Sequence, residues 1–85
     1  MKIKPTKRYQ RSFRRLTKNN KPLGIKVIQT LNLYKNDPNH PSIRLHKLSN
    51  QNIWSISVNM RIRIIFVYYK DSAILLDMGD HSISD

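Results

Sequence analysis

The chain of 85 residues contains no cysteine and no glutamate, and these absences exclude several classes of protein. Without cysteine there is no disulfide framework, no thiolate zinc site and no thiol nucleophile. Two glycines, Gly24 and Gly79, are too few for a loop that cradles a nucleotide phosphate. The longest nearly apolar run, 62–69, is interrupted by Arg63 and is too short to span a bilayer. With no signal-peptide pattern at the start, we expect a cytoplasmic protein.

The positive charge is confined to one part of the chain. The formal net charge is +11, and all five acidic residues are aspartates. Residues 1–36 hold eleven of the 16 Lys and Arg and no acid, whereas residues 37–85 are neutral. Glu–Lys pairs within a helix cannot relieve this repulsion, because glutamate is absent. The asymmetry therefore points to a polyanionic partner, which is a nucleic acid, an anionic membrane or an acidic protein.

Two amphipathic helices are predicted in the basic segment, after a short edge strand over 1–4. Thr6 is a suitable cap for a helix that begins near Lys7. Its apolar stripe comprises Tyr9, Phe13 and Leu16. A second helix begins near Pro22 and ends before the prolines of 36–41. Its stripe comprises Leu23, Val27, Leu31 and Tyr34, with Ile28 alongside.

The period then changes from that of a helix to that of a strand. Strands are predicted over 43–48, 53–58, 62–69 and 73–78, with a polar tail over 79–85. The element order is β-α-α-β-β-β-β, an α+β fold in a single domain over residues 1–85. A basic two-helix hairpin would cover one face of an antiparallel sheet of four to five strands, and the other face would stay partly open.

Arg63 and two histidines are the candidates for chemistry. Arg63 has the opposite parity to Ile62 and Ile64, so it falls on the open face, either as a phosphate ligand or as a strand arginine without a role. With Arg63 as charge stabiliser, His46 and His81 could serve as acid and base for attack of an RNA 2′-hydroxyl on phosphate. Each histidine could equally be structural. The histidines lack metal-ligand spacing, and we expect no metal site.

Four short motifs occur in an order that resembles the C-terminal half of RelE/ParE-superfamily toxins. They are Leu45-His46-Lys47-Leu48, Trp54-Ser55-Ile56-Ser57-Val58-Asn59, Arg63-Ile64-Ile65-Phe66 and Asp77-Met78-Gly79-Asp80-His81. The similarity is greatest to the YafQ/YoeB-like messenger-RNA endonucleases. It implies a RelE-like fold and the toxin of a type II toxin–antitoxin pair. Such toxins are mRNA interferases that cut mRNA, commonly at the ribosome, without a metal or other cofactor, and a cognate antitoxin inhibits them.

The resemblance also implies roles for individual residues. Arg63 matches the phosphate-stabilising arginine, and His46 and His81 match site histidines. Related chains often end in an aromatic residue, commonly tyrosine, where this chain has Ser84. A serine can neither stack on a base nor act as a general acid near neutral pH, so cleavage is expected to be weakened and Ser84→Tyr to raise it. The predicted RNA- and ribosome-binding residues are Lys47, Arg61, Arg8, Arg11, Arg14, Arg15 and Lys18.

Two other functions fit the same residues. ParE-like members share the fold but inhibit DNA gyrase instead of cutting RNA. A basic nucleic-acid-binding domain without catalysis is the plainer alternative. The pair His46 and His81 favours the nuclease, because a gyrase inhibitor has no need of them.

Overall fold

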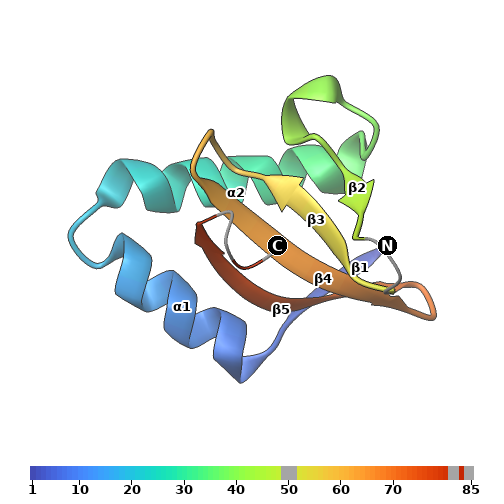
Figure 1. Ribbon diagram of the computed structural model, residues 1–85, viewed down its shortest axis with the longest axis horizontal. Helices are drawn as coiled ribbons and strands as arrows, with labels where there is room; N and C mark the ends of the chain where they lie inside the picture. The colour runs from blue at the N-terminus through green and yellow to red at the C-terminus, as the bar shows by residue number, and fades with distance from the viewer. Residues whose placement is uncertain (49–51, 81–82, 84–85) are drawn as a thin grey trace.

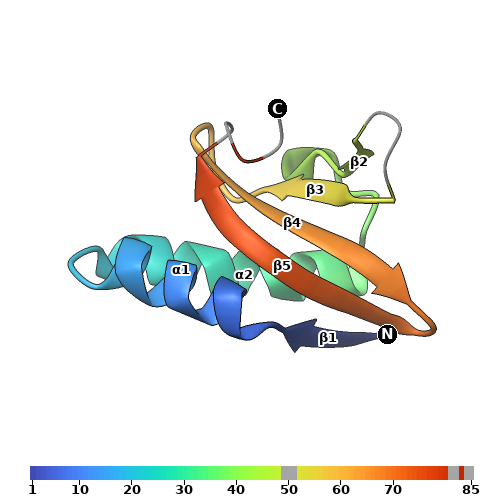
Figure 2. The ribbon, with the colours of Figure 1, turned by 60° about the horizontal axis from the view of Figure 1, so that its bottom comes forward.

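The structure is a computed structural model that describes residues 1–48, 52–80 and 83. Its elements are β1 (Lys2–Pro5), α1 (Lys7–Thr17), α2 (Lys21–Asn36), a 3₁₀ helix (Pro41–Ile43), β2 (His46–Lys47), β3 (Trp54–Ser57), β4 (Ile62–Tyr69) and β5 (Ser72–Asp80). Both helices lie on one side of the sheet (Figures 1 and 2). The predicted α+β fold and element order are confirmed. Among the described residues, no helix is long and apolar enough to cross a membrane.

The two helices begin at the residues that their caps dictate. The Thr6 side chain accepts a hydrogen bond from the Tyr9 N–H, and the Asn20 side chain accepts one from the Leu23 N–H. In α2 the predicted stripe is largely confirmed, because Leu23, Val27 and Tyr34 are buried. Ile28 is instead 56% exposed, and the position that turns inward is Thr30. The Thr30 hydroxyl donates to the Lys26 carbonyl at 2.7 Å, which satisfies this buried polar group.

The sheet has five strands in the order β1-β5-β4-β3-β2. Strands β2 to β5 are antiparallel neighbours, whereas β1 pairs with β5 in parallel. The sheet is therefore mixed rather than wholly antiparallel as predicted. The chain leaves β1 through Thr6, whose N–H and hydroxyl both donate to the Leu75 carbonyl. Helix α1 begins at the next residue and packs along β5.

The predicted strand over 43–48 is wrong over most of its length. Pro41 opens a 3₁₀ helix, and Arg44 has a left-handed backbone with φ 48°. Only His46 and Lys47 then pair with β3. The last strand is longer than predicted, because β5 continues through Gly79 and Asp80 instead of ending at Met78.

The core lies between α2 and one face of the sheet. Ile56, Ile64 and Phe66 are fully buried there, together with Val27 and Tyr34 of α2. Alternation along the strands places Ser57 and Arg63 on the opposite face. At this end of the sheet Ser57, Arg63 and Gly79 are paired across β3, β4 and β5, so they lie on one face.

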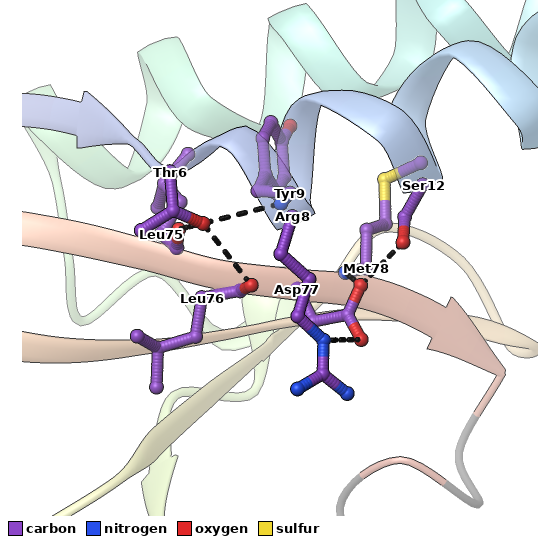
Figure 3. A network of polar contacts seen from close by, with 8 residues as sticks. All are labelled: Thr6, Arg8, Tyr9, Ser12, Leu75, Leu76, Asp77 and Met78. Carbon is purple, nitrogen blue, oxygen red and sulfur yellow. Dashed lines mark hydrogen bonds and ion pairs between the residues drawn. The ribbon is translucent and has the colours of Figure 1, made fainter.

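A register shift in β5 joins the sheet to α1. The pairing passes from Phe66–Leu75 to Ile65–Asp77 and skips Leu76, as in a β-bulge. Asp77 lies against α1, where its carboxylate accepts hydrogen bonds from the Ser12 hydroxyl at 2.5 Å and from the Arg8 Nε at 3.1 Å (Figure 3). Burial alone would raise the pKa of Asp77. The hydrogen bonds from Ser12 and the Met78 N–H and the charge of Arg8 outweigh burial, so this pKa is lowered.

Candidate phosphate-binding site

Three cationic residues from separate parts of the chain line one cavity of about 510 Å³. They are Lys26 of α2, Arg44 after the 3₁₀ helix and Arg63 of β4. None of the described residues that line this cavity is acidic. We call it the cationic cavity. A cavity with several cations and no counter-charge from its own walls is suited to a phosphate group.

The shortness of β2 creates the cationic cavity. Strand β2 pairs only with Trp54 and Ser55, so it does not continue along the rest of β3. The 3₁₀ helix contacts β3 instead, and Arg44, in its left-handed turn, lies in the cavity wall, which Ser57 also lines. Ser57 is the partner of Arg63 in the β3–β4 register. The cavity is thus built where regular pairing stops.

His46 shares a face of the sheet with Arg63 but does not line the cationic cavity. His46 pairs with Ser55, and Arg63 pairs with Ser57, two residues further along β3. Standard strand spacing and rise put their Cα atoms ~12 Å apart. Lys47 pairs with Trp54 and therefore points to the other face, away from Arg63. His46 and Arg63 can contact one extended ligand, whereas Lys47 belongs to a different surface.

The C-terminal residue that the structure describes lies against the strand next to Arg63. Gly79 is opposite Arg63 in the β4–β5 register. A Cβ atom added at Gly79 would lie only 2.8 Å from the Ile83 Cγ2, so the glycine is what allows this close approach. His81 and Ser84, the other two predicted catalytic positions, lie outside the described residues, and their assignment stays a prediction.

The predicted docking residues of α1 and of its C-cap, Lys18, divide into two groups. Arg11, Arg14, Arg15 and Lys18 are exposed, as a docking surface requires. Arg8 is also exposed, but its Nε donates a hydrogen bond to the Asp77 carboxylate. This ion pair within the protein offsets part of the positive charge that Arg8 could offer to a ligand. Arg61 is exposed in the turn before β4 and lines a second cavity that adjoins the cationic one.

Sequence reasoning missed Lys26 and Arg44. It assigned the charge of residues 1–36 to docking and the chemistry to the neutral half, yet Lys26 of the basic segment lies in the cavity of Arg63. Pro41 was the only local sign that the strand before His46 would be interrupted. Nothing in the sequence distinguished Lys26 from the other lysines, because its position depends on how α2 crosses the sheet.

A metal site would need several ligand side chains close together. Over residues 1–48, 52–80 and 83, no group of three or more His, Cys, Asp or Glu residues is placed to hold a metal ion.

The fold can be compared with known proteins. No protein-family model matches this sequence, and no curated protein matches it. Solved structures do match. A YoeB/ParE toxin from Agrobacterium tumefaciens has a TM-score of 0.80 at 13% identity, over 95% of this chain and 99% of that one. YafQ from E. coli has a TM-score of 0.75 at 13% identity, over 95% and 93%. A copper-bound mutant toxin from Helicobacter pylori has a TM-score of 0.72 at 25% identity, over 98% and 97%.

These matches define the class of fold. Two helices packed on a five-stranded, mostly antiparallel sheet form the RelE-like toxin fold. The predicted resemblance to RelE/ParE-superfamily toxins is confirmed at the level of the fold, which YafQ and YoeB share with this chain over nearly its whole length. YafQ has also been solved in complex with DinJ, and that structure matches with a TM-score of 0.77 at 15% identity, over 95% of this chain and 93% of that one.

Proposed function

We propose that this protein is the toxin of a type II toxin–antitoxin pair and a metal-independent endoribonuclease that cleaves mRNA at the ribosome in the cytoplasm. The observation that carries the proposal is the cationic cavity, where Lys26, Arg44 and Arg63 converge and the described wall residues include no acid. This cavity sits on a fold that YoeB and YafQ toxins share. Three cations in one cavity favour a phosphodiester as the ligand.

The proposed reaction is an internal transfer of the phosphodiester. The RNA 2′-oxygen forms a bond to phosphorus, the bond to the 5′-oxygen breaks, and a 2′,3′-cyclic phosphate and a 5′-hydroxyl result. A base takes the 2′-hydroxyl proton, and an acid gives a proton to the leaving oxygen. Arg63 stabilises the charge that develops on the phosphate, with Arg44 and Lys26 beside it. His46 and His81 are proposed as the acid and base, and the reaction needs no cofactor.

The chain's surface supports two macromolecular partners. Arg11, Arg14 and Arg15 of α1 and its C-cap Lys18 form an exposed cationic surface that we assign to ribosomal RNA. The protein partner is a cognate antitoxin. Support for it comes from the resemblance to YafQ, which was solved with DinJ, and from the charge of +11, which an acidic protein segment would neutralise.

The test is to map RNA ends in a cell-free translation reaction. Wild-type protein should produce new 5′ ends in the translated mRNA. Arg63→Gln should lower the cleavage rate about 100-fold or more, as loss of one group that stabilises transition-state charge does. Lys70→Asn is the matched control, because it also removes one charge, from an exposed turn residue whose φ of 56° asparagine tolerates.

Two results would overturn the proposal of nuclease activity. One is a wild-type protein that yields no new mRNA ends but inhibits gyrase supercoiling, which would assign the ParE-like function. The other is an Arg63→Gln variant that cleaves as fast as Lys70→Asn. A protein that binds RNA with neither activity would be the non-catalytic binding domain.

A further inference from the structure

A second cavity of about 390 Å³ adjoins the cationic cavity and has a different chemistry. The two share Lys26 and Asn59 in their walls. The second cavity has an apolar floor of Leu16, Leu23 and Ile62. Its rim is exposed and polar. An apolar floor with a few polar groups at the edge is typical of a site for a small ligand, and a nucleotide base is such a group.

Two asparagine side chains on this rim have fixed orientations. The Oδ1 of Asn59 accepts hydrogen bonds from the N–H groups of Arg61 and Ile62, both at 2.8 Å. The Oδ1 of Asn20 accepts from the Leu23 N–H at 3.2 Å. Since a backbone N–H must meet an oxygen, the amide cannot be flipped. In each residue the Nδ2 group is left over, and within the described parts of the chain it has no partner.

The rim therefore offers hydrogen-bond donors and no competing acceptor from these two amides. An asparagine usually reads adenine with its oxygen and nitrogen together, but here both oxygens are already used. Guanine presents two adjacent acceptors, N7 and O6, whereas adenine presents one acceptor and one donor. Asn20, Asn59 and the Arg61 guanidinium all donate, so they favour guanine.

We propose that this second cavity binds the base of a nucleotide next to the phosphate held by Arg63, and that it selects guanine over adenine. The inference rests on the proposed function in that the ligand is RNA. Lys26 lies in the walls of both cavities, so it can contact the phosphate between them. The base-binding residues come from the turn before α2 and the turn between β3 and β4.

The experiment measures binding of RNA that cannot be cut. The probes are two short oligouridines with 2′-O-methyl groups, one carrying a single guanosine and the other a single adenosine at the same position. Wild-type protein should bind the guanosine probe about tenfold more tightly in fluorescence anisotropy, the lower end for one well-formed base contact. Asn59→Asp keeps the oxygen that accepts from the backbone and loses the amide donor. It should reduce the ratio to about twofold or less.

A matched variant separates base recognition from charge. Asn32→Asp adds the same charge at an exposed position of α2 outside both cavities. It should weaken both probes equally and keep their ratio. Asn59→Ser removes the amide donor without adding charge, keeps an oxygen for the turn, and should lower the ratio as Asn59→Asp does.

The outcomes separate this proposal from the nuclease. Cleavage of mRNA by a wild-type protein that binds both probes equally overturns the guanine site and leaves the nuclease standing. A guanine preference that Asn59→Asp abolishes, in a protein that cuts nothing, supports the site and overturns the nuclease. A wild-type preference that Asn59→Asp and Asn59→Ser leave intact, with both variants folded by circular dichroism, overturns the assignment to this cavity. Binding of a poly-aspartate peptide but of neither probe would assign both cavities to an acidic protein segment instead.

Discussion

Replacing Asp77 by asparagine tests whether the contact between β5 and α1 is a main source of stability. Asp77 is 8% exposed and receives hydrogen bonds from the Ser12 hydroxyl, the Met78 N–H and the Arg8 Nε. Asparagine has nearly the same shape but no charge. It keeps an oxygen acceptor for part of this network, so the substitution removes the charge while leaving the packing almost unchanged.

The expected loss of stability follows from these three contacts. A hydrogen bond to a charged group contributes about 1 kcal/mol more than a neutral one, so the buried bonds from Ser12 and Met78 together lose ~2 kcal/mol. The ion pair adds little, because the Arg8 side chain is 73% exposed. A loss of ~2 kcal/mol lowers the melting temperature of a domain this size by roughly 8–16 °C.

The assay is urea unfolding followed by the fluorescence of Trp54, the single tryptophan. Asp71→Asn in the exposed turn before β5 changes the charge equally and should stay within about 0.5 kcal/mol of wild type. The pKa of Asp77 is lowered in the folded state, so its stabilisation is fully present above the unfolded-state pKa of about 4. The difference between wild type and Asp77→Asn should therefore shrink as the pH falls below 4. An Asp77→Asn variant as stable as Asp71→Asn at pH 7, or a difference that grows in acid, would refute the reasoning.

Two further predictions concern the site and its docking surface. Gly79→Ala places a Cβ 2.8 Å from the Ile83 side chain and must displace it. RNA cleavage should therefore fall at least about tenfold, while the urea midpoint of unfolding changes little. Unchanged cleavage would show that Ile83 has no influence on Arg63. Neutralising Arg11, Arg14 and Arg15 together should weaken ribosome association and reduce the magnitude of its salt slope by about 0.7 for each phosphate that the protein no longer neutralises. Sedimentation with ribosomes at several salt concentrations measures this, and an unchanged slope would contradict the docking assignment.

The sequence by itself determined the helices, the longer strands and which face of β4 carries Arg63. These features depend on local rules, namely the caps at Thr6 and Asn20, the apolar stripe of α2 and the alternation of buried and half-buried residues over 62–67. The motifs around His46 and Arg63 were also enough to indicate the RelE/ParE resemblance, which the fold then confirmed.

Only the tertiary structure decided which residues share a cavity with Arg63. The left-handed turn at Arg44 interrupts the predicted strand, and the crossing of α2 over the sheet brings Lys26 to the same place. The position of Lys26 results from how α2 packs on the core, and the turn at Arg44 closes a 3₁₀ helix that strand periodicity did not predict. The net charge of +11 follows from the sequence alone. Which of the Lys and Arg residues face the candidate phosphate site depends on how the helices lie on the sheet.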